Sequence, residues 1–277
     1  MINYNGTIVA STNELVSNRA FLYGDAIFET VKVLQGKILF LEDHYFRLMA
    51  SMRIIRMNIP MQFTMEYLEG QFLELARQNN CLESARVRMT VFRNDGGLYL
   101  PKDNNIAFII QVLPLERKNY ELPNTVYEVE LFKDFYITKQ LLSTIKSTNR
   151  LVNVVGSIFA DENDFQNCLL LNDDKNVVEA LNGNLFMLKD GQLITPPLSE
   201  GCINGIMRKQ IISLAKQIDG IELIENPISP FDLQKADELF ITNVISGIIP
   251  ITQYRKKKYE TEIAKQLIAL LNNSLIA

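Results

Sequence analysis

Two periodicities of hydrophobic and polar residues alternate along the chain. Apolar residues that recur three and four positions apart predict helices. This pattern occurs in five segments, at 45–55, 65–75, 154–159, 206–218 and 260–275. Pro60 follows the first segment, so we expect that helix to end before the proline. Strand-like segments separate the helices, which indicates mixed α and β structure.

Short turns join several strand-like segments into hairpins. The predicted turns contain residue pairs that favour a tight reversal, Asn5-Gly6, Gln35-Gly36, Asp173-Asp174 and Asp190-Gly191. The segment 85–92 alternates strictly between apolar and polar residues, which predicts a strand buried on one face. The segment 106–114 is mostly apolar and predicts a more fully buried strand. Further strands are expected at 125–132 and 238–242.

The polar stretch between Pro114 and Pro123 is the best candidate for a linker, because a proline stiffens each of its ends. We therefore expect an N-terminal lobe at 1–115, a linker at 116–122 and a C-terminal lobe at 123–277. The expected fold class is α+β. The length of 277 residues fits two such lobes, since a domain typically has roughly 100–200 residues.

Composition limits the partners and the compartment. The chain has 28 Lys+Arg and 32 Asp+Glu, a net charge of −4, which argues against sequence-independent nucleic-acid binding. No segment approaches ~18 consecutive apolar residues, so we expect no membrane span. Cys81, Cys168 and Cys202 form no CxxC pair, and His44 is the single histidine. We therefore expect a cytoplasmic protein without a metal site.

Three polar groups lie where they could carry chemistry, and each has a plainer interpretation. Lys146 lies between an apolar run and an amphipathic helix, where burial would lower the pKa of its amine and make it a nucleophile. The alternative is a surface lysine. Glu179 ends an apolar strand, where it could hold a cation or lie exposed in a hairpin. Arg47 shares a helix face with His44 and Ser51, and could bind a phosphate or face solvent.

Two junctions add weaker signals. A loop with Gly201 and Gly205 leads into a predicted helix, whose first N–H groups could bind an anion or simply be capped. Thr242 and Asn243 come at the end of a predicted strand. The chain contains no GxGxxG, P-loop, HExxH or CxxC motif, so none of the common nucleotide-binding or metal-binding signatures suggests a function.

Taken in order, six sequence blocks resemble the class IV (fold-type IV) pyridoxal-phosphate enzymes. They are YGDAIFETVKV at 23–33, HYFRL at 44–48, IKSTNRL at 145–151, VVEALNGNLF at 177–186, NGIMR at 204–208 and ELFITN at 238–243, with Pro250 beyond. This family includes branched-chain aminotransferases, D-amino-acid aminotransferases and 4-amino-4-deoxychorismate lyases. The resemblance implies a small N-terminal α+β lobe, a larger barrel-like C-terminal lobe with helices, and pyridoxal 5′-phosphate as cofactor.

The resemblance also implies a role for individual residues. Lys146 would form a Schiff base with the cofactor and then remove the substrate Cα proton. Glu179 would pair with the pyridine nitrogen and keep it protonated, which makes the ring an electron sink. Arg47 would bind the cofactor phosphate.

Further residues receive a place at the cofactor or the substrate by the same resemblance. Backbone N–H groups of Gly205, Ile206 and Met207 would also bind the phosphate, and Ile203 would pack on the cofactor ring. Thr30 would assist proton transfer. The remaining cofactor-binding residues would be Asn184, Thr242 and Asn243, and the substrate pocket would contain Tyr23, Phe28 and Arg93.

Departures from the family patterns separate its members. No histidine follows Arg93, unlike the pattern of D-amino-acid aminotransferases. Thr30 and the NGIMR block resemble the lyases, whereas Glu29 resembles the aminotransferases. The motifs favour aminodeoxychorismate lyase, which releases 4-aminobenzoate and pyruvate in folate biosynthesis. The alternative is an amino-acid aminotransferase, branched-chain-like or D-amino-acid, with a 2-oxo acid acceptor. The resemblance further implies a homodimer that acts on a small amino substrate.

Overall fold

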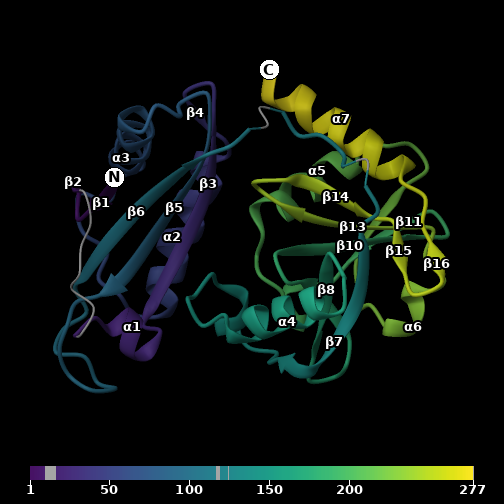
Figure 1. The fold of residues 1–277 in the computed structure, drawn as a ribbon, viewed down its shortest axis with the longest axis horizontal. Coiled ribbons are helices and arrows are strands. Elements are labelled where there is room, and N and C mark those ends of the chain that lie inside the picture. Colours follow the sequence, from purple (N-terminus) through teal and green to yellow (C-terminus); the bar gives the residue numbers. More distant parts are fainter. Residues whose placement is uncertain (10–16, 117–118, 124, 277) are drawn as a thin grey trace. The chain divides into compact units, whose positions relative to one another are not determined.

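A computed structural model of the chain describes residues 1–9, 17–116, 119–123 and 125–276, and the chain divides into two compact units (Figure 1). Unit 1 comprises Met1–Lys118 and Ile145–Asn149, and unit 2 comprises Asn119–Thr144 and Arg150–Ala277. The short segment Ile145–Asn149 places Lys146 in unit 1, whereas the sequence put it in the C-terminal lobe. The reason is local pairing, because this segment bonds through its backbone to the strand that begins at Ala26.

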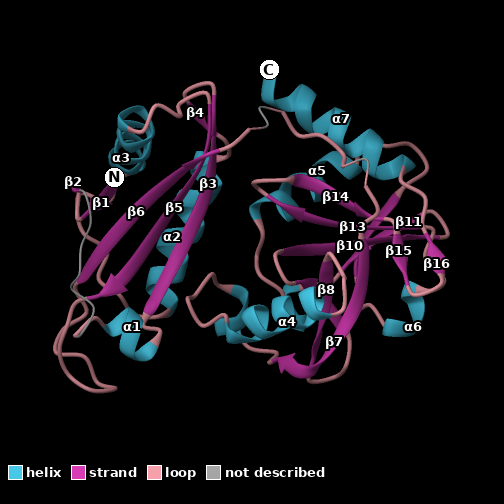
Figure 2. Cartoon of the chain, in the orientation of Figure 1, coloured by secondary structure: helices cyan, strands magenta, loops and turns pink. Residues whose placement is uncertain are grey.

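Unit 1 is built on a six-stranded antiparallel sheet with the order β2-β1-β6-β5-β3-β4 (Figure 2). Positive φ angles at Asn5, Gly6, Gln35 and Gly36 make the two predicted hairpin turns. The strands are β1 Ile2–Tyr4, β2 Thr7–Val9, β3 Ala26–Leu34, β4 Lys37–Ile38, β5 Ser84–Arg93 and β6 Ile106–Pro114.

Two helices cover one face of this sheet, and both were predicted from their apolar spacing. They are α2 Leu41–Ile54 and α3 Met65–Gln78. Ile27 and Val31 of β3 lie in a core cluster with Leu48 and Met52 of α2. Because side chains alternate along a strand, Phe28 and the other even-numbered residues of β3 lie on the opposite face. A short helix, α1 Arg19–Tyr23, precedes β3.

Unit 2 contains a ten-stranded branched sheet whose main path is β12-β11-β10-β9-β8-β7-β15-β16, with β13 paired to β10 and to β14. Three pairs in it are parallel, β7 with β8, β11 with β12 and β15 with β7. The strands are β7 Glu128–Ile137, β8 Asn167–Asn172, β9 Val177–Ala180, β10 Gly183–Lys189, β11 Gln192–Thr195, β12 Glu222–Glu225, β13 Glu238–Asn243, β14 Gly247–Ile251, β15 Gln253–Tyr254 and β16 Lys257–Lys258.

The helices of unit 2 pack on this sheet. In Figure 1, α7 runs alongside α5, and the two helices contact each other. Helix α7 also contacts β14, and α5 contacts β13. The helical segments are η1 Leu141–Thr144, α4 Leu151–Glu162, η2 Leu198–Glu200, α5 Ile206–Ala215, α6 Pro230–Leu233 and α7 Glu262–Ile276. In the described part of the chain, no helix is long and apolar enough to cross a membrane.

The linker predicted at 116–122 is anchored to unit 2 by one buried side chain. Tyr120 is 3% exposed, its hydroxyl donates to the carbonyl of Val244 at 2.6 Å, and its carbonyl accepts from Asn272 Nδ2 at 2.8 Å. Residues 117 and 118 lie outside the described residues. The second half of this stretch is therefore a packed part of unit 2.

One burial expectation was wrong, and one predicted helix has exposed apolar residues. The strand at 106–114 was expected to be more fully buried, but its outer half is exposed, with Leu113 at 57%. The predicted helix α4 forms, yet Val154, Val155 and Ile158 on it are exposed. The apolar spacing located the helix correctly. It did not predict burial, because spacing defines the apolar stripe of a helix and not what covers that stripe.

Candidate active site

Lys146 is fixed by backbone pairing to the first residues of β3. The N–H of Phe28 donates to the carbonyl of Lys146 at 2.7 Å, and the N–H of Thr148 donates to the carbonyl of Ala26 at 3.0 Å. The side chain is partly buried, and its Nζ lies 4.7 Å from the centre of the Phe28 ring. The β-strand pairing thus holds the amine over an apolar surface, as a nucleophile or proton carrier requires.

The face of the sheet under Lys146 is strongly cationic. In the register of β3 with β5, Thr30 lies opposite Arg88 and Lys32 lies opposite Arg86. Arg88 stacks on the Phe28 ring with its Cζ 3.9 Å from the ring centre, and burial and the charge of Arg86 lower the pKa of its guanidinium. Neither strand contributes a carboxylate to this face.

Like charges that face each other across a sheet destabilise it, so this cationic face has a cost that a bound anion would offset. Lys32 is 1% exposed, which puts its charge deep on this face. The sequence analysis did not single out Arg88 or Lys32. The strict alternation of 85–92 did place Arg86 and Arg88 on the polar face of a strand, but it did not reveal their neighbours.

The other face of β3 carries a compact ionised cluster. Glu29 accepts from Arg47 Nε and Nη2, both at 2.7 Å, and from His44 Nδ1 at 2.8 Å. Burial alone would raise the pKa of Glu29, but the charge and hydrogen bonds of Arg47 and the bond from His44 outweigh it and lower the pKa to about 2. Burial lowers the pKa of His44 more than Glu29 raises it, and the charges of Arg47 and Lys146 lower it further.

In unit 2, the buried carboxylate of Glu179 is tied to Ile203. Glu179 Oε2 accepts from the Ile203 N–H at 2.9 Å, and Asn184 Nδ2 donates to the Ile203 carbonyl at 2.8 Å. Glu179 and Asn184 lie opposite each other in the pairing of β9 with β10. The charge of Glu179 favours the cationic form of Arg150, whose pKa is nonetheless lowered by burial. Arg150 is therefore a charge partner of Glu179 that the sequence analysis did not identify.

The start of α5 is suited to an anion. Gly205 is the N-cap residue, and no side chain caps the helix, so the first N–H groups, at Ile206 and Met207, point out of the helix end. A Cβ at Gly205 would overlap Oδ1 of Asn184, so any other residue here would force the Asn184 side chain to move. Thr242 lies opposite Asn184 in the pairing of β10 with β13.

The last two residues of β13 differ in the hydrogen bonds that their side chains make. Thr242 is buried, and its Oγ1 makes no hydrogen bond within the described residues, so this hydroxyl is suited to a ligand. Asn243 instead uses Oδ1 to accept from the N–H groups of Ile245 at 3.1 Å and Ser246 at 2.9 Å. Its side chain therefore shapes the turn after β13.

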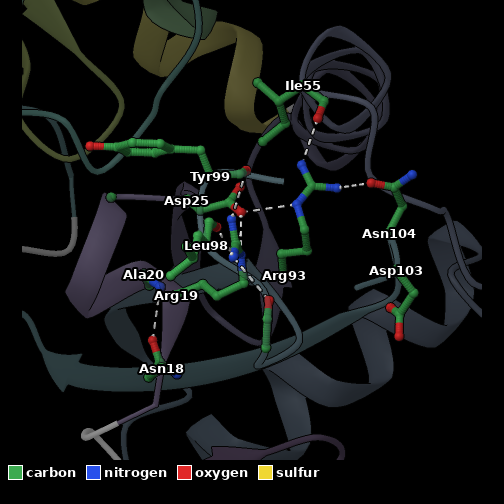
Figure 3. Close-up of polar contacts among 12 residues, drawn as sticks. Asn18, Arg19, Ala20, Asp25, Ile55, Arg93, Leu98, Tyr99, Asp103 and Asn104 are labelled. Carbon is green, nitrogen blue, oxygen red and sulfur yellow. Dashed lines mark hydrogen bonds and ion pairs between the residues drawn. The ribbon is translucent and has the colours of Figure 1, made fainter. Parts of the chain in front are cut away.

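Arg93 makes its hydrogen bonds to protein groups of unit 1, and its place in the substrate pocket stays a prediction. It is 6% exposed, and each of its three nitrogens donates within unit 1 (Figure 3). Nε donates to Asp25 at 2.9 Å, Nη2 donates to the carbonyl of Ile55 at 2.7 Å, and Nη1 donates to Asn104 Oδ1. The side chain is committed to holding the β5–β6 connection.

Arg19 belongs to the same polar cluster in Figure 3. Its Nε donates to Asp25 at 2.9 Å, and its Nη1 donates to the carbonyls of Gly96 at 3.0 Å and Leu98 at 2.6 Å. Tyr23 lies beside this cluster, with its ring 5.7 Å from that of Tyr99. The substrate role of Tyr23 stays a prediction.

Cys202 precedes Ile203 and is a packing residue, as expected for a small apolar side chain in this loop. It is buried, and its Sγ lies 3.5 Å from the carbonyl of Pro196. Burial, with the nearby charge of Glu179, raises the pKa of the thiol to about 12, which keeps it neutral.

Comparison with known proteins identifies the family. The sequence profile of the family described as amino-transferase class IV matches residues 26–254. This chain therefore belongs to the class IV aminotransferase family. Members of this family use pyridoxal 5′-phosphate.

Individual relatives span two reactions. The chain is 34% identical to a putative branched-chain-amino-acid aminotransferase of Methanocaldococcus jannaschii, over 96% of this chain and 93% of the relative. It is 26% identical to an aminodeoxychorismate lyase of Vibrio harveyi, over 87% of each chain. Its fold matches the branched-chain aminotransferase of Thermoproteus uzoniensis with a TM-score of 0.86 at 24% identity, covering 99% of this chain and 94% of the other.

Proposed function

We propose that the protein is an amino-acid aminotransferase that uses pyridoxal phosphate and a 2-oxo acid acceptor. The observation that carries the proposal is the pair of cations on one ring, Lys146 and Arg88, which both lie over Phe28. Amino acids and 2-oxo acids share a carboxylate beside the reacting carbon. A nucleophilic amine and a guanidinium that both contact this ring suit both substrates, because the guanidinium can hold the carboxylate bidentately.

Taken separately, each unit has residues that suit one part of the cofactor. In unit 1, Lys146 is the amine that would bind it covalently. In unit 2, Glu179 would accept from the protonated ring nitrogen, and the first N–H groups of α5 at Ile206 and Met207 would bind its phosphate. The hydroxyl of Thr242, which lacks a hydrogen-bond partner among the described residues, offers a further donor.

The remaining cofactor residues are proposed with different roles. Asn184 would hold Ile203, whose side chain would pack on the cofactor ring, and the Asn184 amide lies where a Cβ at Gly205 would be. Asn243 would act by shaping its turn. Arg47 would bind the phosphate with the edge of its guanidinium that faces away from Glu29.

When bound, the cofactor supplies an electron sink for the carbanion at the substrate Cα. Lys146 would be the base that removes the Cα proton. Phe28 keeps water from the amine on one side. Arg88 orients the substrate through its carboxylate, so that the Cα–H bond faces the lysine.

Aminodeoxychorismate lyase is the second candidate, and Thr30 supports it. This residue lies on the same face of β3 as Phe28, is buried, and is opposite Arg88. A hydroxyl there is suited to carry a proton to a leaving group. The aminotransferase is preferred because the 34% identical relative, a putative branched-chain aminotransferase, covers nearly the whole chain.

The two candidates differ in what they need from solution. An aminotransferase converts the bound cofactor to its pyridoxamine form when only an amino acid is added, and a 2-oxo acid restores it. The lyase releases pyruvate from aminodeoxychorismate with no 2-oxo acid present. We expect the first result, with the absorbance change abolished in Lys146→Ala. Pyruvate release without any amino-acid half-reaction would instead establish the lyase.

We further propose a cytosolic homodimer. Leu151, Val154, Val155 and Ile158 form an exposed apolar face on α4, with Leu151 77% exposed, and an uncovered patch of this kind marks an interaction site. The three cysteines are free and buried, which suits a reducing compartment. Light scattering during gel filtration measures the mass directly, and Ile158→Asp should halve it.

A further inference from the structure

Glu29, His44 and Arg47 form a buried ionised cluster that the proposed reaction does not itself use. Arg47 and His44 lie one turn apart on α2, and both face Glu29 of β3. The carboxylate takes Arg47 through two parallel bonds of 2.7 Å and His44 through one of 2.8 Å. Two parallel bonds fix the guanidinium plane, which a single bond would leave free to rotate.

The protonation of this cluster follows from its geometry. A carboxylate only accepts hydrogen bonds, and Glu29 is ionised because the pKa of its carboxyl is lowered to about 2. The hydrogen between Glu29 and His44 must therefore sit on Nδ1 of the imidazole. Burial lowers the pKa of His44, so the ring is neutral and its Nε2 carries no hydrogen. That Nε2 is buried and makes no hydrogen bond within the described residues.

The same geometry sets the direction of Arg47. Its Nε and one hydrogen of Nη2 point to Glu29, so the remaining guanidinium hydrogens point away from that carboxylate. The neutral His44 adds a second bond to Oε2 and holds the carboxylate in place, without a second positive charge that would compete with Arg47 for it.

We propose that Glu29 and His44 are positioning residues for the cofactor phosphate, which act through Arg47. Glu29 selects the edge of the Arg47 guanidinium that is offered to the phosphate, and His44 fixes Glu29. The inference rests on the proposed function, in which Arg47 binds that phosphate.

The test compares pyridoxal phosphate with pyridoxal, which has the same aldehyde but no phosphate. Apoprotein is titrated with each compound, and covalent binding to Lys146 is followed by absorbance. Glu29→Gln should weaken binding of pyridoxal phosphate about tenfold, the size expected for one charge-assisted hydrogen bond, and leave pyridoxal unchanged. Arg47→Ala should weaken it more, and the double variant should be no weaker than Arg47→Ala alone. Glu42→Gln, an exposed carboxylate of α2, is the matched control.

The outcomes separate this inference from the proposed function. If the wild type takes up neither compound, the proposed function fails. If the wild type binds both and Glu29→Gln either matches it or loses affinity for both equally, Glu29 has a structural role only and the inference is overturned. Glu29→Asp keeps the charge but shortens the reach, so it should show the same phosphate-selective loss if Glu29→Gln does not fold.

One measurement needs no variant. Because His44 is the single histidine, protein labelled with ¹⁵N-histidine gives the signals of this residue alone. We expect the neutral ring with its hydrogen on Nδ1 at pH 7.5. An imidazolium, or a ring with its hydrogen on Nε2, would contradict the arrangement and overturn the inference.

Discussion

The buried cluster of Glu29, His44 and Arg47 should make the stability of the protein depend on pH in two steps. Burial lowers the pKa of His44 in the fold, whereas an unfolded histidine titrates near the ordinary pKa of 6.5. Below that pH the unfolded chain binds a proton that the folded chain does not. Stability therefore falls as the pH drops below 6.5.

Glu29 produces the second and larger step. The pKa of its carboxyl is about 2 in the fold, against 4.5 for the free side chain. That difference of about 2.5 pH units corresponds to roughly 3 kcal/mol of unfolding free energy, at about 1.36 kcal/mol per unit. Because the folded pKa is the lower one, this contribution is complete above pH 4.5 and is lost as the pH falls from 4.5 towards 2.

Urea unfolding at pH 7.5, 5.5 and 3.5 measures both steps. The wild type should lose stability between pH 7.5 and 5.5 and lose more by pH 3.5. Glu29→Gln should be less stable at pH 7.5, because it leaves the Arg47 charge buried without its partner, and it should show a much shallower fall between pH 5.5 and 3.5. Glu42→Gln should follow the wild type.

Parallel curves for the wild type and Glu29→Gln below pH 5.5 would refute this reasoning. They would mean that other carboxylates cause the acid loss. His44→Gln tests the first step separately, since a chain without histidine should lose the fall between pH 7.5 and 5.5.

Three further substitutions test other parts of the structure. Arg88→Met keeps an apolar stem on Phe28 but removes the charge. KM for amino acid and 2-oxo acid should each rise at least about tenfold, while cofactor uptake is unchanged. KM values equal to those of the wild type would exclude the proposed role of Arg88 in binding the substrate carboxylate. Gly205→Ala forces a Cβ onto Asn184, so cofactor affinity should fall while circular dichroism shows the fold retained; unchanged affinity would show that the turn adapts. Tyr120→Phe removes the hydroxyl bond to Val244 and should lower the unfolding free energy by about 1 kcal/mol in urea titrations; no loss would mean that the bond is dispensable.

The local sequence pattern correctly predicted elements whose structure depends on neighbouring residues of the chain. The apolar spacing of α2 and α3 and the turn residues of the hairpins carry their own instructions. Strand β14 was missed because it contains Pro250, which argues against a strand. The structure pairs β14 with β13 alone, and an edge strand tolerates proline. The parallel pairing of β7 with β8 was also missed, since it joins segments separated by α4.

The candidate site likewise includes residues that the sequence indicated and residues that it did not. Lys146, Glu179 and Gly205 were indicated by the order of their sequence blocks. The acceptors around the Arg93 guanidinium were not foreseen, because Asp25, Asn104 and the carbonyls of residues 55 and 56 come from separate parts of the chain. Arg88 was missed, because its place beside Phe28 depends on the register between 26–34 and 84–93, which lie far apart along the chain.

That register decides more than stability. Along β3, Phe28, Thr30 and Lys32 lie on the face that carries Lys146, while Glu29 and Val31 lie on the face that α2 covers. Side chains alternate with a period of two, so a slip of one residue would exchange the two faces. It would remove Glu29 from Arg47 and place an anion under Lys146. Val31 and Val33 oppose the slip, because it would turn these two apolar side chains away from the core. The residues that build the core of unit 1 therefore also keep the carboxylate on the opposite face of the sheet from Lys146.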